Sequence, residues 1–138
     1  MQEATLVFET HIPIPMIVVD GTGIEKGTAV QSTDPLTVSA VSASTNVAGG
    51  IIGSEKIASN GVTKANVYRG GIFKVYASGS VTNGDLLGAD VDNDFYSLTA
   101  PQSITTSNAR IWGISLESAT DGETFLMELN IGGALQVA

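Results

Sequence analysis

The chain contains no cysteine and a single histidine, His11, among its 138 residues. The lack of cysteine excludes disulfide scaffolds, thiolate zinc sites and cysteine nucleophiles. His11 lies in a proline-flanked N-terminal segment, so a serine, histidine and aspartate triad has no well-placed base. Aromatic residues make up only 6% of the chain, which leaves little material for a sugar-binding platform. We therefore expect neither an enzyme nor a bound cofactor.

Positive charge is also scarce, because 6 Lys and Arg stand against 14 Asp and Glu, for a net charge of −8. Phosphate backbones bind clustered cations, and these few basic residues are spread along the chain. The most apolar early stretch, residues 12–19, contains Pro13 and Pro15 and is far shorter than the roughly 20 residues of a membrane-spanning helix. The composition predicts neither nucleic acid nor a membrane as a partner.

What the sequence does contain is a series of short β-branched and apolar runs separated by turn residues. Four Asx-Gly steps provide the left-handed conformations that tight turns need: Asp20-Gly21, Asn60-Gly61, Asn83-Gly84 and Asp121-Gly122. This pattern predicts an all-β fold, either a small β-barrel or β-tulip or, as the alternative, a jelly-roll-like sandwich. The predicted core residues are Phe73, Val75, Trp112, Ile114, Leu126 and Leu129.

The N-terminal segment differs from the rest because its prolines fix φ and lack an N–H group. We expect residues 1–19 to form an extended arm and residues 20–138 to form a single β-barrel domain. Such an arm could add as a strand to a partner protein or to a neighbouring copy. An edge strand of the same barrel is the alternative. The apolar side chains predicted to make this contact are Leu6, Phe8, Ile12, Ile14 and Met16.

An acidic stretch in the second half of the chain has the oxygen-rich spacing of a calcium loop, with Asp90, Asp92 and Asp94 at alternate positions. An EF-hand loop also requires a glycine at its sixth position and a glutamate at its twelfth, where this chain has Phe95 and Pro101. The favoured interpretation is a solvated acidic turn, and a Ca²⁺ site is the alternative.

Several short segments follow one another in a characteristic order: Lys26-Gly27-Thr28-Ala29-Val30, Gly49-Gly50-Ile51-Ile52, Gly70-Gly71-Ile72-Phe73, Asn83-Gly84-Asp85-Leu86 and Trp112-Gly113-Ile114-Ser115. Their order and spacing, over about residues 24–131, resemble those of the capsid decoration, or cement, proteins of tailed bacteriophages. Each motif is short, so the resemblance rests on their succession along the chain.

The resemblance implies a small β-barrel that catalyses no reaction and binds the outer surface of a viral capsid, which it stabilises by bridging subunits of the major capsid protein. It implies self-association, with a trimer favoured over a dimer. It also implies synthesis in the host cytoplasm and a place on the outer capsid surface of the virion. One alternative is a receptor-binding or fibre-head module of the virion that uses the loop-borne pair Phe95-Tyr96. A cellular ligand-binding β-barrel with a concave pocket is the other.

Overall fold

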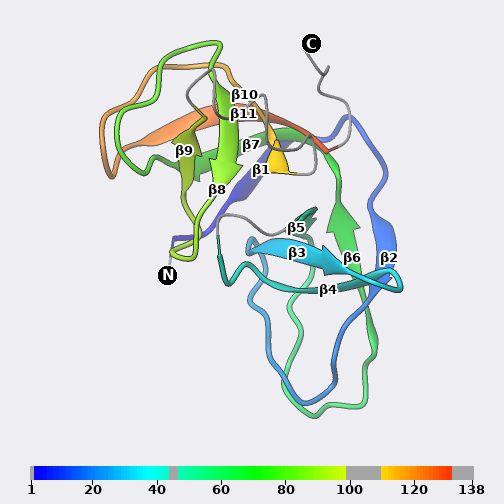
Figure 1. Ribbon diagram of the computed structural model, residues 1–138. Helices are drawn as coiled ribbons and strands as arrows, with labels where there is room; N and C mark the ends of the chain where they lie inside the picture. Colours follow the sequence, from blue (N-terminus) through cyan, green and yellow to red (C-terminus); the bar gives the residue numbers. More distant parts are fainter. Residues whose placement is uncertain (1, 44–46, 99–109, 132–138) are drawn as a thin grey trace.

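The computed structural model describes residues 2–43, 47–98 and 110–131, and these residues form a closed barrel beside a second sheet (Figure 1). The prediction of an all-β fold with a small barrel is confirmed. The barrel strands are β2 (Ile14–Ile17), β3 (Ala29–Thr33), β4 (Thr37–Ala40), β5 (Ala48–Ile52) and β6 (Lys64–Tyr68). The sheet strands are β1 (Thr5–Phe8), β7 (Gly70–Tyr76), β8 (Leu86–Ala89), β9 (Phe95–Ser97), β10 (Gly113–Ser115) and β11 (Thr124–Asn130).

The barrel closes in the order β2-β4-β3-β5-β6. Its neighbouring strands are antiparallel except for β2 and β4, which are parallel and share the Ile17–Thr37 pair. Aliphatic side chains occupy the centre, where a ligand-binding barrel would hold its ligand: Met16, Val18, Ile24, Val30, Val38, Ile52, Ala65 and Val67. Among the described residues, no helix has the length and apolar character needed to span a membrane.

The second sheet has the order β1-β7-β11-β10-β8-β9, with antiparallel neighbours throughout. Its inner face packs against β5 of the barrel, and all five residues of β5 are buried because that strand lies between the two lobes. Four of the predicted core residues are buried in this shared core: Phe73, Val75, Trp112 and Leu129. The hydrophobic effect therefore joins barrel and sheet into one body.

Two predicted core residues lie on the outer face of the sheet instead. Ile114 is 43% exposed, and Leu126 is only partly buried. Side chains alternate between faces along a strand, so the inward positions of β11 belong to Phe125 and Met127, and Leu126 between them points outward. The core assignment of Ile114 and Leu126 was wrong because an apolar run without clear alternation does not reveal its own register.

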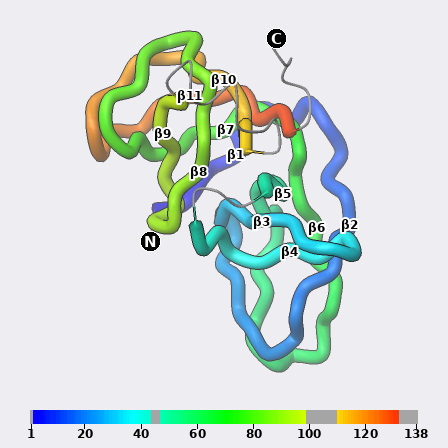
Figure 2. The backbone as a smooth tube through the Cα atoms, in the orientation of Figure 1, coloured from blue at the N-terminus to red at the C-terminus, as the bar shows by residue number. Residues whose placement is uncertain are grey.

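The N-terminal segment pairs with one continuous stretch of the chain. Strand β1 pairs with β7, and β2 pairs with β6, both antiparallel. Because β6 and β7 are consecutive, residues 5–17 run antiparallel to residues 64–76 through both lobes. Figure 2 shows the blue and green tubes alongside each other at the edge of the molecule. We call this paired segment the tie ribbon.

The tie ribbon replaces the free arm that the sequence suggested for residues 1–19. Strand β1 is the edge strand of the sheet, and β2 closes the barrel between β6 and β4. The chain is therefore divided differently from the expected boundary at residue 20, because the barrel is an insertion between β1 and β7 of the sheet. Prolines marked this segment as an arm, but pairing with a distant part of the chain holds it in place.

Asn93 fixes the β8–β9 hairpin to the barrel. Its side chain is 4% exposed, and Oδ1 accepts a hydrogen bond from the N–H of Ala29 at 2.7 Å. Its Nδ2 donates to the carbonyl oxygen of Gly27 at 3.0 Å and to that of Gln2. Asn93 has a φ of 61°, in the left-handed region that asparagine tolerates better than most residues. One amide thus satisfies buried backbone groups of the barrel from a turn of the sheet.

We predict that Asn93→Ala lowers the free energy of unfolding by about 2–4 kcal/mol, because an unpaired buried polar group costs about 1–3 kcal/mol. Asn93→Gly, which accepts a positive φ, should lose a similar amount and so separates hydrogen bonding from backbone strain. Urea denaturation measures both variants. Asp92→Ala, an exposed site in the same hairpin, is the control and should stay within about 0.5 kcal/mol of the wild type. Losses below about 1 kcal/mol for both Asn93 variants would contradict the assignment.

Candidate docking surface

The residues that the sequence predicted to contact a partner fall on both faces of the fold. Met16 is 2% exposed within the barrel core, and Leu6 packs against the core beneath the sheet. Both side chains pack within this chain. Phe8 is 63% exposed, Ile12 is 86% exposed, and Ile14 is also exposed. These three side chains remain available for docking.

A β-bulge explains why Leu6 and Phe8 point in opposite directions. Leu6 lies opposite Phe73, whereas Phe8 lies opposite Ile72, and the register shifts between them. Residues two apart in a regular strand share a face, so an extra residue in β1 moves Phe8 to the outer face. The bulge therefore exposes an aromatic ring that regular alternation would bury.

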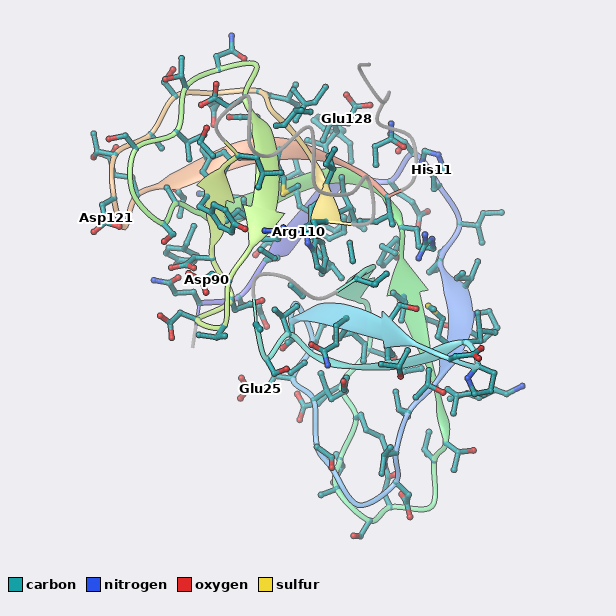
Figure 3. The ribbon with its side chains drawn as sticks, in the orientation of Figure 1. His11, Glu25, Asp90, Arg110, Asp121 and Glu128 are labelled. Atoms are coloured by element: carbon teal, nitrogen blue, oxygen red, sulfur yellow. The ribbon has the colours of Figure 1, made fainter. Side chains whose placement is uncertain are left out.

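The connector between β1 and β2, residues 9–13, is held against the junction of the two lobes. The Tyr68 hydroxyl donates to the carboxylate of Glu9 at 3.0 Å. Burial, reinforced by Glu9, raises the pKa of Tyr68, which keeps the hydroxyl a donor. The His11 ring covers Gly70, where a Cβ atom would lie 2.4 Å from its Nδ1 (Figure 3). Ile12 thus projects from a segment that is fixed on both sides.

An open groove continues this apolar surface along the seam between β2 and β4. Its volume is about 440 Å³, and its lining residues are Ile14, Met16, Ser32, Thr33, Asp34, Leu36 and Arg69. Ile14 on β2 and the exposed Leu36 before β4 give it an apolar entrance. We define the docking strip as Phe8, Ile12, Ile14 and Leu36.

Pro15 explains how the seam stays open. The N–H of Val18 donates to the carbonyl oxygen of Thr63, next to the β2–β6 ladder. Backbone groups alternate in direction along a strand, so the backbone nitrogens of Pro15 and Ile17 point away from β6 and toward β4. The N–H of Ile17 donates to the carbonyl oxygen of Leu36 at 2.8 Å. Pro15 has no N–H to donate and lies where the seam widens into the groove. Its missing N–H therefore costs the barrel no ladder hydrogen bond.

The acidic loop forms the turn of the β8–β9 hairpin. Asp90 Oδ1 accepts a hydrogen bond from the N–H of Val91 at 2.7 Å, and the N–H of Asp90 donates to the carbonyl oxygen of Asp94 at 2.9 Å. Within the described ranges, no group of three or more His, Cys, Asp or Glu residues is arranged to hold a metal ion. The Ca²⁺ alternative for Asp90, Asp92 and Asp94 stays a prediction. Sequence reasoning missed that this turn presents Asn93 to the barrel.

Of the aromatic pair beside this loop, Phe95 is part of the core, and Tyr96 is partly buried. Phe95 is fully buried and packs edge to face on Trp112, with ring centroids 5.8 Å apart. Tyr96 lies over Gly88, where a Cβ atom would come within 2.8 Å of the phenol ring. A glycine in β8 therefore makes room for the tyrosine ring. The exposed aromatic side chain that sequence reasoning sought here is supplied by Phe8.

Comparison with known proteins shows what this fold is shared with. No protein-family model matches the chain, and no curated protein matches it. Among solved structures, the crystal structure of the head fiber gp8.5 N base of bacteriophage phi29 is similar, with a TM-score of 0.54. The identity is 13%, and the match covers 86% of this chain and 93% of that chain. The two proteins share their fold over most of their lengths.

Asp94 provides a test of the electrostatics of the acidic hairpin. Burial raises the pKa of Asp94, and the nearby Asp90 and Asp92 raise it further. A carboxyl with a raised pKa in the folded state binds its proton more tightly there than in the unfolded chain. It therefore destabilises the fold above its folded pKa, and this penalty disappears as the pH falls through that pKa toward the usual value of 3.8.

We predict that Asp94→Asn raises the melting temperature at pH 7 and that the gain shrinks as the pH is lowered toward 4, about the usual pKa of an aspartate. Thermal denaturation across this pH range measures the effect. Asp34→Asn changes the net charge equally at an exposed site outside the hairpin and serves as the matched control. A lower melting temperature for Asp94→Asn at pH 7 would show that the carboxylate is stabilising instead.

Proposed function

We propose that this chain is a structural protein of a tailed-phage virion that binds the outer surface of the capsid, bridges subunits of the major capsid protein and catalyses no reaction. The proposal includes self-association, with a trimer favoured over a dimer, as the resemblance to decoration proteins implies. The observation that carries the proposal is the docking strip, an apolar surface of which Phe8, Ile12 and Ile14 lie on a segment that is paired with β6 and β7. The fold shared with a bacteriophage head fiber base supports it.

The physical case for the docking strip is that its exposure gives the isolated chain no benefit. Phe8 and Ile12 expose large apolar side chains to solvent. Exposed apolar patches mark interaction sites. Because the tie ribbon and the Glu9–Tyr68 hydrogen bond already fix the segment, binding would lose little conformational entropy.

Binding of this kind stabilises a shell by mass action. A protein that binds the assembled lattice better than free subunits shifts the equilibrium toward assembly by its binding free energy. A copy that contacts two adjacent subunits links them through a rigid body, and repetition over the lattice multiplies the effect. No metal, cofactor or moving part is needed for this function.

The competing functions have less support. A virion fibre module is consistent with the head fiber base as a structural neighbour, but its expected recognition pair fails because Phe95 is buried. A ligand-binding barrel needs an interior space that Met16, Val30 and Val67 fill. For an enzyme, the single histidine, His11, has the hydroxyl of its neighbour Thr10 at 2.9 Å from Nδ1, where a catalytic triad has a carboxylate.

We predict that Phe8→Ser with Ile12→Ser weakens binding to capsids assembled without this protein by at least about 100-fold. Burial of each large apolar side chain contributes about 1.5–3 kcal/mol, and 1.4 kcal/mol corresponds to a factor of ten. Cosedimentation with such capsids measures affinity, and cryo-electron microscopy counts the bound copies.

The matched control is Val47→Ser with Val91→Ser, which removes two exposed aliphatic side chains elsewhere and should bind like the wild type. Point variants are preferable to deletion of residues 1–15, which would remove β1 and part of β2. A wild-type protein that ignores undecorated capsids would refute the function. Full binding by the Phe8 and Ile12 variant would refute the docking strip.

A further inference from the structure

The end of the barrel farthest from the six-stranded sheet is built from two loops, residues 18–24 and 53–63, which we call the barrel tip (Figures 1 and 2). The loops are joined where Ile24 and Lys56 exchange backbone hydrogen bonds, at 2.9 and 2.8 Å. The carbonyl oxygen of Asp20 accepts from the N–H of Ser59, and its carboxylate accepts from the N–H of Gly61. The tip is therefore a cross-linked structure although it contains no sheet.

Lys56 is the centre of this network. The residue is 2% exposed, and its Nζ lies 2.8 Å from Asp20 Oδ1 and 2.7 Å from Asn60 Oδ1. Two backbone oxygens, those of Asp20 and Ile57, lie at 3.1 and 2.6 Å. Burying an ammonium group is costly unless it is paired and hydrogen-bonded, and here four oxygens surround it. The hydrogen bond from Lys56 lowers the pKa of Asp20, which keeps its partner ionised.

The tip displays apolar side chains that the barrel core does not need. Val19, on the first loop, and Ile57, on the second, are each 60% exposed. Val62, also on the second loop, is exposed as well. The barrel core is completed by other residues, including Val18 and Ile24 at the base of the first loop. A buried lysine thus fixes loops whose outward side chains are aliphatic. Fixing a binding loop in advance reduces the entropy lost on association.

Charge separates the tip from the rest of the surface. The Asp20–Lys56 ion pair cancels two formal charges, which leaves Glu55 as the remaining charged residue of residues 18–24 and 53–63. The whole chain carries −8. The tip can therefore approach an apolar surface with little desolvation of charge.

We propose that the barrel tip is a second capsid-binding surface, which inserts Val19, Ile57 and Val62 into an apolar depression on a major capsid protein subunit. This inference rests on the proposed function. Strand β2 connects the docking strip to the tip, and Ile12 and Val19 lie at most about 23 Å apart at about 3.3 Å per residue. Contacts at both ends of one rigid strand would let a single copy bridge two neighbouring subunits, as a cement protein must.

The first test removes two of the three aliphatic side chains of the tip without touching the core. Val19→Ser with Ile57→Ser should weaken cosedimentation with capsids assembled without this protein by at least about 10-fold. The matched control is again Val47→Ser with Val91→Ser. If the wild type and the tip variant bind equally while the Phe8 and Ile12 variant does not, the tip inference is overturned and the proposed function stands. If the wild type does not bind, the function itself fails.

Self-association through the tip is a separate outcome, which sedimentation equilibrium of the free protein detects. A tip variant that loses oligomers yet binds capsids like the wild type would assign the tip to a second copy and overturn the proposal. An unchanged oligomeric state with weakened capsid binding supports it.

A second test addresses the role of Lys56 in holding the loops. Lys56→Met keeps the three aliphatic side chains but removes the network, so hydrogen exchange should rise in residues 18–24 and 53–63 and capsid binding should weaken. If this variant fails to fold, Asn60→Ala removes one exposed acceptor of the network and replaces it. Faster exchange in the tip with unchanged binding would overturn the requirement for a fixed tip.

Discussion

The antiparallel pairing of residues 5–17 with residues 64–76 is the constraint on which the rest of the structure depends. It places β1 at the edge of the sheet and β2 in the barrel, so one ribbon belongs to both lobes. Because a shift of one residue would exchange buried and exposed faces, the packing of Leu6 against the core and the burial of Met16 fix the register on either side of the connector. The connector itself is then held in place, and Ile12 projects from it.

A feature of the fold could be predicted from the sequence where neighbouring residues alone determine it. Turn chemistry was local. Of the glycines in the four predicted Asx-Gly turns, Gly61, Gly84 and Gly122 have positive φ and Gly21 does not. The alternation of Phe73 and Val75 around Lys74 was local too, and both are buried. The place of the N-terminal segment was not local. Prolines indicate that a strand lacks a neighbour on one side, but they do not say which distant strand lies on the other.

The candidate site was predictable in part for the same reason. Phe8, Ile12 and Ile14 were found because apolar residues among prolines have few buried places to go, whereas Met16 follows Pro15 by one residue and turns into the barrel. At the acidic hairpin, the spacing of the three aspartates indicated an acidic turn or a calcium loop. It did not predict the buried hydrogen bonds of Asn93, which lies between two of them. Within the barrel tip, the sequence predicted one feature, the turn at Asn60-Gly61. The burial of Lys56 depends on oxygens from two loops and has no signature in either one.

A rigid frame matters more than contact area for a protein that works by linking repeated subunits. Two contacts of about 1 mM affinity each correspond to about 4 kcal/mol apiece, too weak for either alone to decorate a shell. When both lie on one fixed strand, the second forms at a high effective concentration, and the pair reaches much tighter binding without new contacts. A flexible arm would lose this advantage by spreading its second contact over a large volume. The folding of the N-terminal segment into the tie ribbon is therefore consistent with a bridging role.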